Sequence, residues 1–366
     1  MMDGIKFGSY EKEDAIFLLK DLTGIDLEGA SEVREQEIQR GRHYCETLPI
    51  EEQPNDEYMN LFWRLLDSYK REVALLAGIV AEQIYRSKGK ETVLVSLARA
   101  GTPVGVLIKR YIKGKYGLSL PHYSISIIRG KGIDERAIHY ILERHKGNEI
   151  QFIDGWTGKG AISLELRKSC RKFYDEYDIL LDDNIAVLAD PGHCSTLYGT
   201  REDFLLPSAC LNSTVSGLVS RTVLNTHFIK EDDFHGAKYY KEFEDIDVSN
   251  AFINMISNEF QSIYSLAEED AERSLKEVKR ADFKGLKSVK KIADEFSVEN
   301  INLIKPGVGE TTRVLLRRMP WKILVKDFDS PYIKHILLLA QEKKVELIHY
   351  PDMDYACCGL IQQLKG

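Results

Sequence analysis

Residues 149–166, EIQFIDGWTGKGAISLEL, contain the pattern that decides the fold. An apolar run ends at Ile153, a glycine-rich loop follows, and a stretch with helical periodicity begins at Gly160. A strand, a glycine turn and a helix in this order are typical of βαβ units. The glycines let backbone N–H groups converge on an anion at the start of the helix. The sequence therefore predicts an α/β sheet with an anion-binding loop at its carboxyl edge.

Further strands and helices alternate on both sides of this stretch. Residues 91–97, 123–128 and 185–189 are predicted strands, and helices are expected at 14–22, 61–88, 102–116 and 134–145. Residues 205–211 are expected to add a strand. A second strand–helix pattern fills residues 302–349. We expect an α/β fold with a mostly parallel sheet, covered by helices on both faces, plus a small C-terminal α/β domain.

Charge divides the chain into two unequal parts. The 366 residues carry a net charge of −7, which argues against nucleic-acid binding by the whole surface. Residues 272–366 contain 18 Lys and Arg against 13 Asp and Glu, a net of +5, so the remainder carries −12. Such asymmetry predicts two parts with different partners. The expected domains are residues 1–230, a helical linker at 231–298, and residues 299–366.

Composition excludes several classes of protein. No run of 18 apolar residues occurs, and acidic residues stand where a signal peptide needs a basic segment, so we expect a cytoplasmic protein without membrane contact. The cysteines form no CxxC pair, which argues against a disulfide framework or a zinc knuckle. They lie at Cys45, Cys170, Cys194, Cys210, Cys357 and Cys358. The sequence leaves a homodimer open.

A second candidate anion-binding loop lies in SLARAGTPVG, residues 96–105. Arg99 stands between small residues, where a backbone and a guanidinium together can hold a diphosphate. We expect this loop and the Asp154 loop to meet at one edge of the sheet. Between them, Arg129 and Lys131 lie in a glycine-flanked loop that could close over phosphates. Glycine turns without any ligand are the alternative.

The segments SLARAGTP and FIDGWTGKG resemble the diphosphate and ribose-phosphate loops of type I phosphoribosyltransferases. Their arrangement is similar to the phosphoribosyltransferase-like proteins of bacterial tellurium-resistance (stress-response) gene clusters, a group also described as the cysteine protease StiP family. The resemblance implies a type I phosphoribosyltransferase-like domain over about two thirds of the chain. It also implies transfer of ribose 5-phosphate from phosphoribosyl diphosphate to a small-molecule, base-like acceptor. The transition state would need electrostatic stabilisation rather than a covalent nucleophile.

The same resemblance implies roles for individual residues. Mg²⁺ would be the cofactor, with Asp154 as a ligand. The catalytic residues would be Asp154, Arg129 and Lys131. Substrate-binding roles would fall on Arg99, Ala100, Gly101, Thr102, Gly155, Thr157, Gly158, Lys159, Gly160, Ala161 and Asp190.

A cysteine hydrolase or protease is the alternative activity. Cys194 or Cys210 would be the nucleophile and His193 or His235 the base, because a thiol needs a neighbouring base. A metal site from Asp190, His193 and His235 is a weaker alternative, since no ligand-spacing motif supports it. The segments GRHYCETLP, residues 41–49 with His43 and Cys45, and FHGAKYY, residues 234–240, could form a hood over the active site, and their histidines and tyrosines are expected to be packing residues.

The C-terminal segment KPGVGETTRVLLRR, residues 305–318, resembles the pelota-type RNA-binding domain. Its glycines permit close approach to an RNA backbone, and its arginines can meet phosphates. The resemblance implies structured RNA as a partner, bound by Lys305, Gly307, Gly309, Glu310, Thr311, Thr312 and Arg313. A non-catalytic nucleotide- or RNA-binding regulator is a further alternative, and so is a module that contacts only protein.

Overall fold

The computed structural model describes residues 7–29 and 43–362, and its centre is a parallel six-stranded sheet. The strand order is β1-β6-β5-β9-β10-β11, and each neighbouring pair is parallel. In that order the strands are Ile16–Phe17, His122–Ile125, Thr92–Leu97, Glu149–Trp156, Ala186–Ala189 and Leu197–Thr200. The mostly parallel sheet predicted from the sequence is confirmed.

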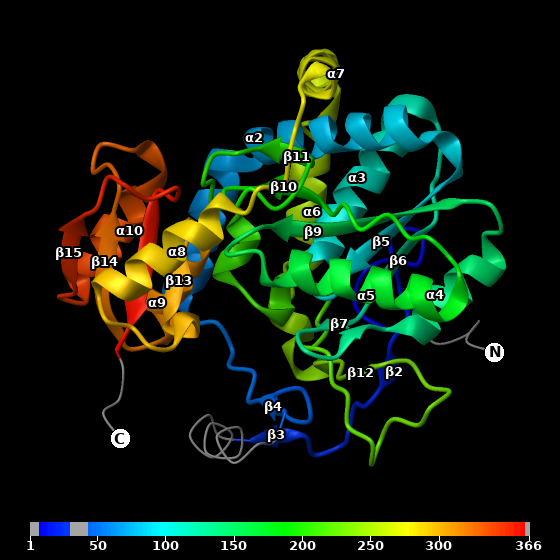
Figure 1. Ribbon diagram of the computed structural model, residues 1–366, viewed down its shortest axis with the longest axis horizontal. Coiled ribbons are helices and arrows are strands. Elements are labelled where there is room, and N and C mark those ends of the chain that lie inside the picture. Colours follow the sequence, from blue (N-terminus) through cyan, green and yellow to red (C-terminus); the bar gives the residue numbers. More distant parts are fainter. Residues whose placement is uncertain (1–6, 30–42, 363–366) are drawn as a thin grey trace.

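Helices cover both faces of this sheet because its central strands are apolar on both sides. In β5, Val93, Val95 and Leu97 pack into one core, and Leu94 packs into the other. Helices α2 (Asp56–Lys88) and α3 (Gly101–Tyr116) cover one face (Figure 1). Helices α4 (Glu135–Arg144) and α5 (Ala161–Tyr177) cover the other. Such two-sided burial is typical of parallel sheets.

The segment predicted as a helical linker, residues 231–298, contributes to the main core. Helix α6 (Ser249–Ser257) and helix α7 (Phe260–Lys276) place Phe252, Ile263 and Ala267 in the same hydrophobic cluster as residues of α2 and α3.

Three short strand pairs in the described part of the chain lie outside the main sheet of the body. They are β2 (Lys20–Asp21) with β12 (Gly236–Ala237), β3 (Glu28–Gly29) with β4 (Leu48–Pro49), and β7 (Ile127–Ile128) with β8 (Gly132–Ile133).

The C-terminal domain has its own four-stranded sheet in the order β13-β16-β14-β15. These strands are Ile304–Pro306, Cys357–Ile361, Pro320–Val325 and Glu346–His349, and only the β14–β15 pair is parallel. Helices α8 (Lys284–Glu295), α9 (Val308–Arg317) and α10 (Lys334–Glu342) pack on this sheet. The small C-terminal α/β domain predicted from the sequence is therefore confirmed.

Two local predictions are wrong. Residues 14–22 form strands β1 and β2 instead of a helix, because Ile16 and Phe17 extend the edge of the sheet beside Tyr123 and Ser124. Residues 205–211 contain a 3-10 helix, Pro207–Cys210, instead of a strand, because the turn packs against α2 and α9. No helix in the described ranges is long and apolar enough to cross a membrane.

Asp203 joins the C-terminal domain to the body. Its two carboxylate oxygens accept hydrogen bonds from the backbone N–H groups of Val308 and Ala356, each at 2.9 Å. The side chain is buried, and burial raises the pKa of its carboxyl to about 6. Apolar residues of α9 and α10 continue the main core around this contact. The two domains thus share one interior.

Substituting Asp203 tests this junction. We expect Asp203→Ala to lower the free energy of unfolding by about 2–4 kcal/mol, because two buried N–H groups lose their acceptor. Asp203→Asn keeps one acceptor oxygen and should cost less. Urea unfolding of both variants measures the difference. If the alanine variant were as stable as the parent protein, Asp203 would not be the residue that stabilises the junction.

Candidate functional site

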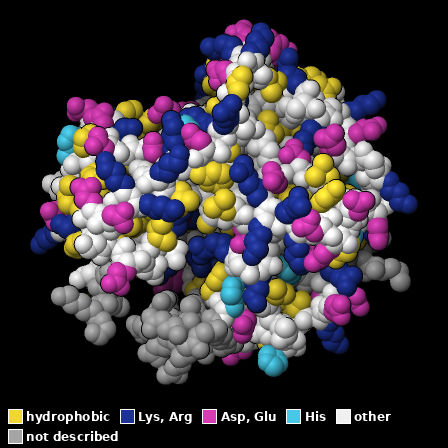
Figure 2. Space-filling view, in the orientation of Figure 1, with side chains coloured by type: hydrophobic (Ala, Val, Ile, Leu, Met, Phe, Trp, Pro, Cys, Tyr) yellow, Lys and Arg dark blue, Asp and Glu magenta, His cyan; other side chains and the backbone are white. Residues whose placement is uncertain are grey.

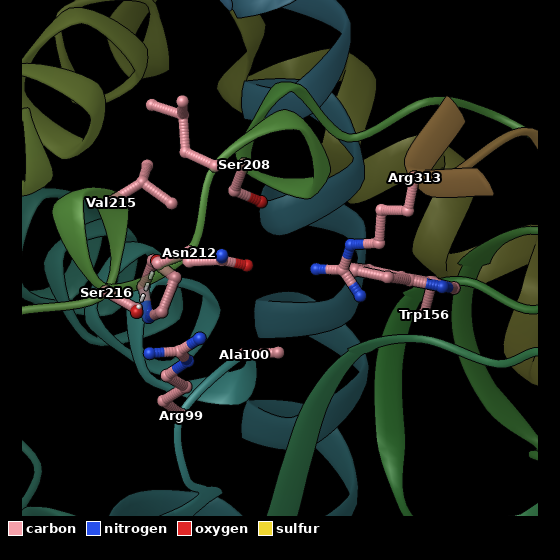
Figure 3. A pocket seen from close by; sticks show the side chains of 10 residues that line it. Arg99, Ala100, Trp156, Ser208, Asn212, Val215, Ser216 and Arg313 are labelled. Atoms are coloured by element: carbon pink, nitrogen blue, oxygen red, sulfur yellow. Dashed lines mark hydrogen bonds between the residues drawn. The ribbon is translucent and has the colours of Figure 1, made fainter. Parts of the chain in front are cut away.

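The two predicted loops lie side by side at the carboxyl edge of the sheet. A Cβ on Gly155 would lie 3.7 Å from the carbonyl oxygen of Ala100. Side chains of both loops line one small pocket with residues 208–216 and a side chain of α9 (Figure 3). The pocket residues are Arg99, Ala100, Pro103, Trp156, Ser208, Leu211, Asn212, Val215, Ser216 and Arg313. The structure therefore brings together the Arg99 and Asp154 loops, as expected.

The Arg99 loop is occupied by internal contacts. The Arg99 guanidinium pairs with Glu51 at 3.1 Å and donates to the carbonyl of Val219 at 2.9 Å. Thr102 is fully buried and hydrogen-bonds to Ser124. Gly101 leaves room for β9, since a Cβ there would lie 2.5 Å from the Ile153 carbonyl oxygen. These residues hold α3 on the sheet.

The C-terminal part of the chain fills the predicted phosphate cradle. The Tyr355 hydroxyl donates to the carbonyl of Gly158 at 3.2 Å. Lys159 donates to the carbonyl of Ile301 at 2.7 Å. A Cβ on Gly160 would lie 2.7 Å from the Phe283 ring. Ala161 begins α5 directly behind this contact. The glycines of the loop thus leave space in which Phe283 and Tyr355 of the same chain pack.

Asp190 organises the end of the neighbouring strand. It accepts hydrogen bonds from the Thr157 hydroxyl and from the backbone N–H groups of Cys194 at 2.8 Å and Ser195 at 3.0 Å. Arg201 pairs with its second oxygen. With all these partners inside the protein, Asp190 serves to shape the turn after β10.

Asp154 differs from Asp190 in having few partners. Its carboxylate accepts from the N–H of Gly155 at 2.8 Å, and Arg313 is the nearby cation. Burial raises the pKa of Asp154 to about 7. The residues present do not fit a resident Mg²⁺, because glycine follows this single carboxylate and carboxylate oxygens are its preferred ligands. Within residues 7–29 and 43–362, no three His, Cys, Asp or Glu side chains form a metal-binding group.

The cysteines proposed from the sequence as nucleophiles are both buried. The Cys194 thiol donates to the carbonyl of Gly192 at 3.3 Å, and burial raises its pKa to about 12. The His193 ring lies 3.7 Å from Asp282. The His235 ring contacts the Ser126 hydroxyl at 2.8 Å. Cys210 lies in the apolar core of the body. Neither histidine is thus held against Cys194.

A cysteine–histidine contact occurs instead in the loop before β4. The Nδ1 atom of His43 lies 2.9 Å from the Sγ atom of Cys45. The backbone N–H of Leu224 fixes this loop by donating to the Cys45 carbonyl at 3.0 Å. The sequence predicted that this segment covers the site, with His43 as a packing residue. The signal available was the His-x-Cys spacing in GRHYCETLP, which lets an irregular loop turn one side chain onto the other.

The basic loop between β7 and β8 lies directly beside this contact. The Arg129 backbone N–H donates to the Tyr44 hydroxyl at 2.9 Å, and the Arg129 guanidinium lies 5.5 Å from the Tyr44 ring centre. A Cβ on Gly130 would lie 3.4 Å from Nε2 of His43. Burial raises the pKa of Cys45, and the charge of Lys131 opposes that shift. The predicted Arg129 and Lys131 thus border a thiol and an imidazole.

The predicted RNA-binding residues face the body. Thr311 and Thr312 are fully buried. A Cβ on Gly307 would lie 3.1 Å from Asp203, and one on Gly309 would lie 3.4 Å from Ala209. Arg313 donates to the Ala209 carbonyl at 3.1 Å, pairs with Glu310 at 3.2 Å and lies 5.1 Å from the Trp156 ring centre. Lys305 is half-buried. These residues therefore form one wall of the junction.

Comparison with known proteins identifies both parts of the chain. Residues 8–257 match the family described as tellurite-like stress resistance cysteine protease StiP. The chain belongs to the StiP family. It is 32% identical over 378 residues to the "Cysteine protease StiP" of Acinetobacter baylyi, covering 98% of this chain and 95% of that protein. Residues 283–363 match the PELOTA RNA binding domain.

The StiP match corrects the activity expected from the sequence. A phosphoribosyltransferase using phosphoribosyl diphosphate is contradicted, because the family and the relative are both named as cysteine proteases. The filled glycine loop gives a physical reason, since Tyr355 and Phe283 lie where a sugar phosphate would need the backbone. The catalytic and substrate-binding roles in transfer that were expected for Asp154 and for the two loops depended on that activity and are contradicted with it.

The raised pKa of Asp154 makes a prediction about stability. The folded state holds this proton up to about pH 7, whereas the unfolded carboxyl loses it near pH 4, so stability falls as the pH rises through that window. We expect Asp154→Asn to stabilise the protein at pH 8 by about 1–3 kcal/mol and to have less effect at pH 4.5. Urea unfolding at both pH values measures this.

Asp190→Asn is the matched control. It should destabilise the protein at pH 8, because its carboxylate has an arginine and three hydrogen-bond donors. A loss of stability in Asp154→Asn as large as in Asp190→Asn would contradict the difference between the two carboxylates.

Proposed function

We propose that this protein is a cysteine hydrolase that cleaves peptide bonds, with Cys45 as the nucleophile and His43 as its base. The observation that carries the proposal is the 2.9 Å contact between Sγ of Cys45 and Nδ1 of His43. A thiol becomes a nucleophile when a base within hydrogen-bond distance takes its proton. The names of the family and of the Acinetobacter relative support peptide hydrolysis as the reaction class.

The reaction has two chemical stages. Cys45 gives its proton to His43, and the thiolate attacks the carbonyl carbon of the peptide bond. The C–N bond then breaks, and the leaving amine takes the proton from His43, so that an acyl-thioester remains on the sulfur. Water, deprotonated by His43, attacks this thioester and releases the acid together with the free thiol. The raised pKa of Cys45 makes the proton transfer to His43 necessary at neutral pH.

The basic loop defines the electrostatics around the sulfur. Arg129 and Lys131 are exposed next to Tyr44 and Cys45. Positive charge at this position stabilises the thiolate and favours acidic side chains in the substrate. Cys45 is 2% exposed, so a substrate reaches it only when a covering segment moves. The 129–131 loop is the adjacent segment with positive-φ glycines at both sides of Lys131.

Substitution of single cysteines tests the nucleophile. We expect Cys45→Ala to abolish hydrolysis of a fluorogenic casein substrate and His43→Ala to reduce it at least 100-fold, because the base is lost. Cys194→Ala and Cys210→Ala are the matched controls, and both should keep activity within a few fold if folding is intact by circular dichroism. Activity that survives in Cys45→Ala and disappears in Cys194→Ala or Cys210→Ala would assign the nucleophile to those positions instead.

We also propose that the C-terminal domain binds RNA. The match of residues 283–363 to the PELOTA RNA binding domain supports this, and so do the exposed Arg318 and half-buried Lys305 at the junction. We expect the full chain to retard a structured RNA in an electrophoretic mobility shift assay, and we expect added salt to weaken this binding.

We also propose that the body has a type I phosphoribosyltransferase-like architecture. The two adjacent loops at the ends of β5 and β9 support this proposal.

A further inference from the structure

Cations from both domains gather where the domains meet. Arg129, Lys159 and Arg221 come from the body, and Lys305, Arg313 and Arg318 come from the C-terminal domain. Lys159 donates to the Ile301 carbonyl at 2.7 Å and Arg313 to the Ala209 carbonyl at 3.1 Å, both across the junction. The charges of Arg129, Arg221 and Arg318 all act on Lys305. Lys and Arg side chains are prominent along the seam between the two domains in the space-filling view (Figure 2). Arg129, Arg221 and Arg318 are exposed to solvent. The seam is therefore a positively charged surface that neither domain forms alone.

Among the described residues, two carboxylates, Glu51 and Glu310, lie within this group of cations. Glu51 pairs with Arg99, and Glu310 pairs with Arg313. Within the described part of the chain, no ion pair joins Arg129, Arg221 or Arg318 to a carboxylate. Although part of the Arg221 side chain is exposed, crowding of its guanidinium by neighbouring groups and the charges of Arg99 and Arg313 lower its pKa to about 10, while Glu51 opposes the shift. A surface built from mutually repelling cations is stabilised when an anion binds to it.

The pocket at the end of the seam adds a flat aromatic surface and polar groups. The Arg313 guanidinium lies against the Trp156 ring, and Asn212 points toward it across the pocket (Figure 3). Ser208 and Ser216 line the same space. Aromatic and guanidinium planes stack on nucleobases, and amide and hydroxyl groups hydrogen-bond to base edges. These features suit a nucleotide chain better than an acidic peptide, which has no base to stack.

We propose that a single-stranded segment of RNA binds in this seam, with its phosphates on Arg129, Arg221 and Arg318 and one base against Trp156. The inference rests on the proposed RNA binding of the C-terminal domain and extends it to the body. The buried threonines and glycines of α9 and its preceding turn agree with it, because that face of the domain meets the body instead of open solvent. RNA that binds along the edge of this face must then also touch the body.

The seam also reaches the proposed protease dyad. Arg129 contacts Tyr44, the residue between His43 and Cys45, and its charge also helps to lower the pKa of Lys159 and of Lys305. RNA that draws Arg129 toward its phosphates would therefore move the loop that lies beside Cys45. Bound RNA should change the rate of peptide hydrolysis as a consequence.

Fluorescence anisotropy of the full chain with a fluorescein-labelled 20-nucleotide oligouridylate tests the proposal. We expect Arg221→Ala and Arg318→Ala each to weaken binding 5- to 20-fold in 100 mM salt. Each should lower the slope of log K against log salt by about 0.7, the value for one lost phosphate contact on a single strand. Arg273→Ala is the matched control, because that side chain is 72% exposed on α7 and pairs with Asp270. It should leave affinity within twofold.

The outcomes separate the two proposals. If Arg318→Ala lost binding while Arg221→Ala and Arg129→Ala bound fully, RNA binding in the seam would be contradicted, and RNA binding by the C-terminal domain would stand. Absence of binding by the parent protein, to the oligouridylate and to structured RNA, would overturn both. Binding of polyglutamate at equal affinity, with loss in the same variants, would identify the seam as a site for acidic protein instead.

Discussion

The C-terminal domain docks on the carboxyl edge of the sheet, and this contact determines which surfaces of the body remain open to a ligand. One buried carboxylate, Asp203, accepts from two backbone N–H groups of that domain, and apolar residues of α9 and α10 extend the core of the body around it. Parallel α/β sheets expose their loop-rich carboxyl edge, where ligands normally bind. Here much of that edge is covered by the chain itself.

This covering changes what the glycine-rich loop can do. Its backbone groups and its space are used by Tyr355, Phe283 and the Ile301 carbonyl, so the loop serves as a docking surface. The same contact brings cations of two domains together around Trp156 and Arg313. A pattern that suggests a sugar phosphate in sequence thus becomes, in three dimensions, a seam whose charge fits a polyanion.

The residues of the proposed chemistry do not belong to the strands of the six-stranded sheet. His43 and Cys45 belong to an irregular loop that is held by Leu224 and bordered by the Arg129 loop. Cys194 and Cys45 are both buried with raised pKa values, and the difference between them is that the Cys45 thiol lies against a histidine ring whereas the Cys194 thiol donates to a backbone carbonyl. A thiol two residues from a histidine is a weak signal in a sequence, because only the turn of the loop decides whether the two side chains meet.

The α/β class, the mostly parallel sheet and the separate C-terminal domain could be predicted from the residues alone, since apolar periodicity and glycine turns act over short stretches of chain. The same patterns placed the Arg99 and Asp154 loops at one edge, because strand order and direction follow from alternating strands and helices. Three features could be found only in the folded chain: the filled cradle, the edge strand of Ile16 and Phe17, and the contact of His43 with Cys45. Each of these depends on contacts between side chains or segments whose geometry no local pattern encodes.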